Sequence, residues 1–477
     1  MKKPIKHYSL LCIMLSVCMI YTSCSGEIEN NTVKEQNQEV SQDKGIEQDN
    51  DQEQDDDQEQ EKVEVEASKK DSNINSENAS NMNTETKETD LPVEGYESEA
   101  KLSKEFLQRY YDFTEKTSAI VFQENIGENQ IYAPINYYLA LSMLSELSGG
   151  EAREEIQEVL RISDNKLNAS ELNIAIHTLE KSLGRFGRLN VNTSLWLNDE
   201  LNYQEELLTK LRSQYSTEVY KGNLKNSEFQ NRMTKWVYDN TNHEFMPDYH
   251  DSLDKTDPYA FISLNTLDFY DEWAFPSEVE DTTAEPFILS DNNEITCDFM
   301  KLEKTFYPYM VGEDYISTIC MLKDNESMLF ILPEEGLTVE DLINERSKLS
   351  GIISDWTNEQ FTMSKVKLSV PKFAYDSESD LEATAEAMGI KKIFDKNSKA
   401  FSEFSDSNIY VTDILQASKI KIDEKGCSAS SYTEIIAQGA GLAEGEVEIN
   451  LNRPFIYVLF KNKVPFLVGI IQNPLKN

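Results

Sequence analysis

Residues 423–441 read Asp-Glu-Lys-Gly-Cys-Ser-Ala-Ser-Ser-Tyr-Thr-Glu-Ile-Ile-Ala-Gln-Gly-Ala-Gly, between strand-like runs at 414–422 and 447–460. This stretch has no helical period, no Pro and many small side chains. A loop of this length in a compact domain is uncommon unless it is functional or disordered. Disordered segments favour charge and Pro. The sequence therefore predicts a segment with strand character that lacks a place in a sheet.

Alternating positions divide this stretch into two faces, because successive side chains of an extended chain point to opposite sides. One face is small or apolar and carries Cys427, Ala429, Ser431, Thr433 and Ile435. The other face carries Ser428, Ser430, Tyr432, Glu434 and Ile436. The first face suits burial in a sheet while the second faces solvent. A surface loop of small residues has the same composition, so this stretch alone leaves both interpretations open.

The N-terminus has the pattern of an export signal. Lys2, Lys3 and Lys6 precede an apolar run at 10–20, which is followed by Tyr-Thr-Ser-Cys24. A basic segment, a short apolar run and small residues before a cleavage point indicate a signal peptide over residues 1–24. The run is short for a transmembrane helix. Cys24 stands where bacterial lipoproteins carry their lipid, so we expect a lipid-anchored protein, with a plainly secreted one as the alternative.

Residues 25–100 have a different composition, dominated by Glu, Asp, Gln, Asn and Ser. Such a segment buries too little apolar surface to offset the entropy of ordering, so it is predicted to be a disordered acidic tether. Its Asp runs lack the ligand spacing and the Gly of an EF-hand loop. No metal site is predicted here or elsewhere.

Residues 101–477 are expected to form one α+β domain, because helix-period patterns come first and strand-like runs dominate later. The formal net charge of −41 argues against binding to nucleic acid or to an anionic membrane. Only Cys297, Cys320 and Cys427 remain after residue 24, too few for the disulfide framework of a small exported domain.

Chemistry-bearing motifs are sparse in this domain. The sequence has no Gly-x-Ser-x-Gly elbow, no phosphate-binding Gly loop and no pair of His residues at zinc-protease spacing. Cys427 has no His near it in the sequence, so it is expected to be a small inward-facing side chain rather than a nucleophile. The prediction is a protein that is not an enzyme and needs no cofactor.

Short motifs in a fixed order identify a family. They are Ala133-Pro-Ile-Asn136, Leu139 to Gly150 with Glu151-Ala-Arg-Glu-Glu-Ile156, Asn192-Thr-Ser-Leu-Trp196, Asn265-Thr-Leu-Asp-Phe269 with Trp273 and Thr282, Pro371-Lys-Phe373, Asp423-Glu-Lys-Gly426, Arg453-Pro-Phe455, Phe466-Leu-Val-Gly469 and Asn473-Pro474. Each motif alone is weak, but the ordered set resembles the serpins, the serine protease inhibitors, over residues 101–477. The resemblance implies helices packed on three β-sheets with an exposed reactive-centre loop.

The resemblance also implies a mechanism. A protease cleaves the loop and is held as an acyl-enzyme, and the loop then inserts into the main sheet. The expected partner is an extracellular serine protease in a covalent complex, and the serpin itself is expected to be a monomer. A non-inhibitory binding protein on the same scaffold and an inhibitor of papain-like cysteine proteases are the alternatives.

By this resemblance the residues that must enter the sheet first are Glu424, Gly426, Cys427, Ala429, Ser431 and Thr433. Cys427 stands where the family usually has Thr or Ser. Counting from Glu424 places the reactive bond at Ala440–Gly441, and counting back from Arg453 moves it towards Leu442, Ala443 and Glu444. Ala before the bond implies an elastase-like or subtilisin-like protease.

Two further groups of residues follow from the resemblance. Asn136, Asn265 and Gln416 fall where the family keeps a polar cluster beneath the opening of the sheet, although the first and last are usually Ser and His. Trp273, Lys372 and Glu424 fall where the loop first enters, and an ion pair between Lys372 and Glu424 is expected.

Overall fold

The computed structural model describes residues 101–180, 187–252, 259–324, 326–345, 348–427 and 445–476. Its α-helices are α2 (Lys104–Val121), α3 (Pro134–Leu147), α4 (Gly150–Leu160), α5 (Asn165–Glu180), α6 (Glu205–Gln214), α7 (Ser227–Asn240), α8 (Tyr249–Ser252), α9 (Leu349–Thr357) and α10 (Leu381–Met388). Short helical turns lie at Val279–Asp281 and Asp341–Glu345.

Helix ends follow from local chemistry. The Ser103 hydroxyl caps α2 by accepting a hydrogen bond from Phe106 N at 3.0 Å. Pro134 opens α3, where a missing backbone N–H costs nothing. Gly389 ends α10 at a φ of 106°, which glycine adopts without a steric penalty.

The strands are β1 (Gln130–Tyr132), β2 (Arg188–Asn198), β3 (Glu218–Gly222), β4 (Phe261–Glu272), β5 (Thr283–Ile288), β6 (Glu294–Val311), β7 (Tyr315–Met321), β8 (Glu326–Pro333), β9 (Thr362–Pro371), β10 (Phe373–Asp380), β11 (Leu415–Ile422), β12 (Gly426–Cys427), β13 (Glu446–Asn450), β14 (Phe455–Lys461) and β15 (Val464–Ile471). They form three sheets. The α+β prediction with helices on three sheets is confirmed.

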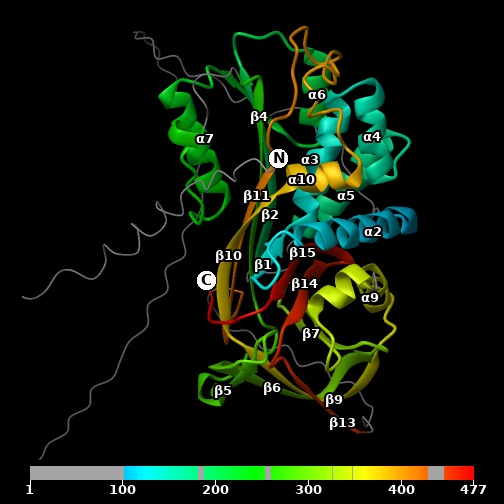
Figure 1. Cartoon of the computed structure of the whole chain (residues 1–477), viewed down its shortest axis with the longest axis vertical. Helices are drawn as coiled ribbons and strands as arrows, with labels where there is room; N and C mark the ends of the chain where they lie inside the picture. Colours follow the sequence, from blue (N-terminus) through cyan, green and yellow to red (C-terminus); the bar gives the residue numbers. More distant parts are fainter. Residues whose placement is uncertain are drawn as a thin grey trace, which may run out of the picture. The chain divides into compact units, whose positions relative to one another are not determined.

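The largest sheet has nine strands in the order β1-β15-β14-β8-β7-β6-β9-β13, with β5 paired to β6. A four-stranded sheet has the order β12-β4-β2-β3, and β10 pairs with β11 alone. Figure 1 shows the long strands β2, β4, β10 and β11 along the vertical axis, with α7 on one side and α3 and α5 on the other.

One predicted strand is divided in two. The run at 447–460 was expected to be continuous, but β13 ends at Asn450 and β14 begins at Phe455. Pro454 lies between them and has no N–H to donate to a ladder. The break allows β13 to pair in parallel with β9 and β14 to pair with β8 and β15.

The core joins the helices to the nine-stranded sheet. All residues of β15 are buried. The ring of Tyr138 in α3 makes edge contacts with three rings of α2. They are Phe106, Tyr110 and Phe113, at centroid distances of 5.1–6.1 Å. Such aromatic contacts add stability beyond the area they bury. They hold α3, the helix that carries Asn136, against the rest of the core.

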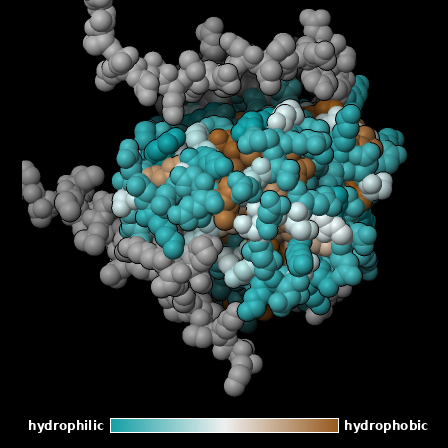
Figure 2. Space-filling model, turned by 90° about the horizontal axis from the view of Figure 1, so that it is seen from above, coloured by the Kyte–Doolittle hydropathy of each residue, from teal (hydrophilic) through white to brown (hydrophobic). Residues whose placement is uncertain are grey.

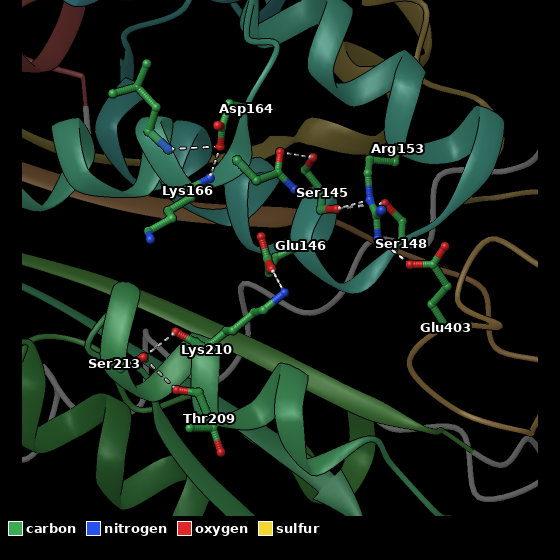
Figure 3. A network of polar contacts seen from close by, with 12 residues as sticks. Ser145, Glu146, Ser148, Arg153, Asp164, Lys166, Thr209, Lys210, Ser213 and Glu403 are labelled. Atoms are coloured by element: carbon green, nitrogen blue, oxygen red, sulfur yellow. Dashed lines mark hydrogen bonds and ion pairs between the residues drawn. The ribbon is translucent and has the colours of Figure 1, made fainter.

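Polar contacts at the far end of α3 connect three helices (Figure 3). Glu146 of α3 pairs with Lys210 of α6 at 3.1 Å. Arg153 of α4 donates to the Ser145 carbonyl at 3.2 Å and to Glu403 at 2.6 Å. Because Glu146 is almost completely buried, its pair with Lys210 fixes the position of α6 relative to α3.

The outer surface is mostly hydrophilic, as Figure 2 shows for one face, with apolar atoms in limited patches. Among the residues that the structure describes, the helices are too short or too polar to cross a membrane.

Candidate functional site

A tight turn at residues 423–426 links β11 to β12. The backbone groups of Asp423 and Gly426 exchange two hydrogen bonds of 3.1 Å. Gly426 has a φ of 142°, and a Cβ built on it would lie 2.6 Å from the carbonyl oxygen of Asp271. Glycine is therefore required at this position by both the backbone conformation and the close approach of β4.

Trp273 holds this turn against β4. Its indole Nε1 donates to the Asp423 carbonyl at 2.9 Å, and its backbone N donates to the Lys425 carbonyl at 3.0 Å. The side chain is 3% exposed, so both bonds lie in a largely water-free environment. Trp273 thus connects both ends of the turn to the strand it follows.

Glu424 is the buried acidic residue of the turn. Its Oε1 accepts from Lys372 Nζ at 3.0 Å and from the Thr282 hydroxyl at 2.9 Å. Burial opposes ionisation of the carboxyl, but its own backbone amide, Lys372 and Thr282 together lower its pKa below the usual value. The expected Lys372–Glu424 ion pair is present. Trp273, Lys372 and Glu424 therefore meet at one place.

β12 joins the end of β4 through two residue pairs. Gly426 is opposite Glu272 and Cys427 is opposite Asp271, in antiparallel register. Over residues 261–270, the described partners of β4 lie only on the β2 side. β11 pairs with β10 along its whole length, from Leu415 to Ile422, and has no other strand partner among the described residues. Beyond β12, the edge of β4 opposite β2 and the edge of β11 opposite β10 therefore have no strand partner among the described residues.

The three amide residues expected to form one polar cluster make separate contacts. Gln416 accepts from Ala133 N at 2.6 Å and donates to Ala133 O at 3.1 Å. Asn265 accepts from the Thr193 hydroxyl at 2.7 Å. The buried Oδ1 of Asn136 has no hydrogen-bond partner in the described part of the chain. Among the described residues, no hydrogen bond joins these three side chains to one another.

Several predicted site residues lie outside the described residues, namely Cys24, Ala429, Ser431, Thr433, Ala440, Gly441, Leu442, Ala443 and Glu444. The backbone of Cys427 is described as part of β12. On the distal side of the loop the described chain resumes at Gly445, whose carbonyl accepts from the Ser364 hydroxyl at 3.1 Å. The loop is thus anchored on β4 at one end and on β9 at the other.

The remaining cysteines have little reactivity. Cys297 and Cys320 are buried and unpaired with each other. Burial, above all, raises their pKa values to about 11 and about 12. Thiols with raised pKa values in apolar surroundings are poor nucleophiles. Among the described residues, no group of three or more His, Cys, Asp or Glu side chains is arranged to hold a metal ion.

Sequence reasoning missed a set of buried charges next to the turn. Asp271, Glu272, Asp324 and Glu326 are all at most 5% exposed. The available signal was the pair Asp271-Glu272 at the end of a strand, since adjacent residues of a strand face opposite sides and one of them must point inward.

Comparison with known proteins agrees with this architecture. The family model described as Serpin (serine protease inhibitor) matches residues 108–474. A serine protease inhibitor of Rattus norvegicus is 24% identical over 358 residues, which cover 73% of this chain and 84% of the relative. The plasma serine protease inhibitor of Mus musculus is 22% identical over 374 residues, which cover 76% and 89%.

Solved structures share the fold. The native state of tengpin, a thermophilic serpin, has a TM-score of 0.69 at 22% identity and covers 79% of this chain and 96% of its own. Human thyroxine-binding globulin complexed with thyroxine has a TM-score of 0.66 at 20% identity and covers 78% and 98%. Since the family model spans more than half of the sequence, the chain belongs to the serpin family, the serine protease inhibitors.

Proposed function

We propose that this protein is a suicide-substrate inhibitor of extracellular serine proteases with elastase-like or subtilisin-like specificity. The observation that carries the proposal is the antiparallel pairing of Gly426 and Cys427 with the end of β4. The first residues of the loop are thereby aligned with a strand edge that has no further partner among the described residues.

Continuing this register assigns a partner to each inserting residue. Since Cys427 is opposite Asp271, an extended loop would bring Ala429 opposite Phe269, Ser431 opposite Leu267 and Thr433 opposite Asn265. The register reaches Phe261, the first residue of β4, at Ala437. The free edge of β4 therefore suits the segment that ends just before Ala440.

Insertion of the loop as a strand beside β4 is expected to lower the free energy of the chain. Each ladder hydrogen bond contributes about 1 kcal/mol net, so a strand of roughly ten residues contributes on the order of 10 kcal/mol. At about 3.4 Å per residue, insertion of about 14 residues moves the protease attached at its end by some 50 Å. This displacement is the physical basis of trapping: the acyl-enzyme is carried away before water completes hydrolysis.

Specificity is assigned from the residues at the reactive bond. Ala440 before Gly441 suits a small or shallow primary pocket, and Ala443 before Glu444 in the other register suits the same pocket. Between Lys425 and Arg453 the sequence has no Lys or Arg, which disfavours trypsin-like proteases. The export signal and Cys24 support an envelope location with residues 25–100 as a tether.

Incubation with pancreatic elastase or subtilisin, followed by a denaturing gel, tests the proposal. A covalent band is expected at the summed mass of the two proteins less the peptide released beyond the reactive bond, and mass analysis of that peptide identifies the bond. Loop cleavage without any complex, at every ratio of protein to protease, would contradict the proposal. Papain in a parallel incubation tests the cysteine-protease alternative.

Two variants that place the same charge on opposite faces of the loop test whether complex formation depends on loop insertion. Ser431→Arg places a charge on the face expected to be buried, so it should convert the inhibitor into a substrate. Ser430→Arg places the same charge on the opposite face and should leave complex formation intact. Equal behaviour of the two variants would argue against insertion in this register.

A non-inhibitory binding protein is the second candidate, favoured by Cys427 and by the separate contacts of Asn136 and Gln416. Thyroxine-binding globulin shows that the fold also accommodates a ligand-binding protein. Melting curves before and after loop cleavage separate the candidates. A large rise in melting temperature supports insertion, and an unchanged value supports the second candidate.

A further inference from the structure

A cavity of about 230 Å³ lies between α3, α5, β2 and the segment that leads from α6 into β3. Its apolar lining comes from Leu139 of α3, Ile176 of α5 and Val191 of β2. One water molecule takes up about 30 Å³ of liquid, so the cavity has room for a molecule of roughly eight non-hydrogen atoms. This size suits a small organic ligand rather than a single ion.

The charged side chains that line this cavity are acidic. They are Glu180, the last described residue of α5, and Glu218, the first residue of β3. Among the described lining residues no side chain is a lysine or an arginine. α6 ends at Gln214, directly before the lining residue Tyr215, and the C-terminus of a helix carries partial negative charge. The electric field in the cavity therefore favours a cation.

Neither carboxylate is neutralised by a basic side chain of the described part of the chain. Glu180 accepts one hydrogen bond, from Val191 N at 3.0 Å, and Glu218 accepts one from the Tyr220 hydroxyl. His177 is exposed one turn before Glu180 and acts on it only at longer range. Both carboxylates thus keep acceptor capacity for a further donor.

The basic side chains of α6 have carboxylate partners of their own. Lys210 pairs with Glu146 of α3 at 3.1 Å, as Figure 3 shows. Arg212 pairs with Glu205 within α6 at 3.7 Å. These two cations are therefore engaged away from Glu180 and Glu218.

One lining residue has an unused hydrogen-bonding group. Tyr215 is 2% exposed, and its hydroxyl has no hydrogen-bond partner among the described residues. A buried polar group without a partner costs free energy. A ligand that brings N–H groups into the cavity would reduce that cost, which is a second reason to expect an amine.

The two carboxylates are tied to different points along β2. Glu180 receives its hydrogen bond from Val191, and Glu218 pairs with Ser194 in the parallel ladder. Val191 and Ser194 are three residues apart in the sequence, which is about 10 Å along a strand. A diamine with a chain of about five carbons spans such a distance once a hydrogen bond of about 2.8 Å is added at each end.

We propose that this cavity binds a small aliphatic diamine, with one ammonium group at Glu180 and the other at Glu218. The methylene chain packs against Leu139, Ile176 and Val191. Two charge-assisted hydrogen bonds favour the diamine over a monoamine of the same length, and the acidic lining rejects a carboxylic acid. None of the lining residues belongs to β4, β11 or β12, so the site does not depend on the proposed inhibitory function.

Calorimetric titration of the full-length protein with cadaverine tests the site. Pentylamine offers the same chain with one ammonium group, and pentanoate offers a similar chain with a carboxylate. At one ionic strength, cadaverine is expected to bind about tenfold more tightly than pentylamine, because it makes one more charge-assisted hydrogen bond. Pentanoate should not bind.

Two variants locate the binding. Glu180→Gln and Glu218→Gln keep the shape of the side chain and remove its charge, so each should weaken cadaverine binding about tenfold, to the level of pentylamine. Glu206→Gln is the control, because it removes an exposed carboxylate of α6 outside the lining and should leave the affinity unchanged. Weak binding of cadaverine to acidic residues elsewhere is common to all these proteins and cancels in the comparison.

Two results would overturn the site. Equal affinity of the wild type, Glu180→Gln and Glu218→Gln for cadaverine would show adventitious binding to the acidic surface only. Binding of pentanoate as tight as that of cadaverine would show that charge does not select the ligand. If a variant does not fold, the ligand series with the wild type still decides. No protease enters the titration, so a failed ligand site and a failed inhibitor are recognised by separate measurements.

Discussion

Lys372 Nζ lies 3.0 Å from Glu424 Oε1, so an ion pair links the end of the nine-stranded sheet's β9 to the turn that starts the reactive loop. The Thr282 hydroxyl shares the same oxygen. The carboxylate has two donors from separate segments, and its position defines where the loop leaves β11.

Replacement of Lys372 by Met should cost little stability. The lysine side chain is 35% exposed, so the pair is screened by solvent and is worth about 0.5–1 kcal/mol. Urea unfolding measures the change. Lys235→Met removes the exposed pair with Asp239 in α7 and is expected to cost even less. A loss above about 3 kcal/mol for Lys372→Met would contradict this prediction, because a loss of that size is typical of a broken buried ion pair.

Glu424 should make stability depend on acid pH. Its pKa is lowered in the folded chain, so the stability that its carboxylate contributes is complete above the usual value of 4.5 and is lost as the pH falls through the folded value. The difference in unfolding free energy between wild type and Glu424→Gln should therefore be larger at about pH 7 than at about pH 3.5. A difference that is constant with pH would mean that the carboxylate is not responsible.

Gly426→Ala should displace β12 from β4. The added Cβ would lie 2.6 Å from Asp271 O at a φ that L residues avoid, which costs about 1–3 kcal/mol. Thermal melting gives the loss. Gly351→Ala in α9 is the control, since its Cβ meets no atom within 4 Å and alanine favours a helix. Equal stability of the two variants would show that β12 tolerates a side chain there.

Lys461→Met should destabilise the chain strongly. Lys461 and Glu326 are 2% and 1% exposed, so the substitution leaves a buried carboxylate without its cation and costs about 3–5 kcal/mol. Lys476→Met is the control, because Lys476 and Glu128 are both half exposed and the loss should stay below about 1 kcal/mol. Adding Glu326→Gln to Lys461→Met should recover part of the loss; no recovery would point to packing instead.

Motifs with a local cause were predictable from the sequence. The helix opened by Pro134, the turn at Gly426 and the ion pair of Lys372 with Glu424 each follow from short-range chemistry or from a family motif that spans the chain. The division of the 447–460 run also had a local cause, Pro454, which the apolar pattern concealed.

Features that depend on the packing of distant strands were not predictable. Asn136, Asn265 and Gln416 were expected to form one polar cluster, yet Gln416 bonds the backbone of Ala133 and Asn265 bonds Thr193 of β2. The cluster around Asp271 requires β4, the β7–β8 turn and β14 to converge, from positions up to 190 residues apart. No periodicity in one segment encodes such a convergence.

The burial of Cys297 and Cys320 makes the base of the loop chemically addressable. Their protonated thiols should react slowly with maleimides. Within residues 101–477 the sequence has one other cysteine, Cys427, so labelling of the wild-type chain with a maleimide dye tests whether that thiol reacts faster. The backbone of Cys427 is opposite Asp271, so a dye attached there would mark the first inserting pair of the loop, and a change of its emission on loop cleavage is the expected result.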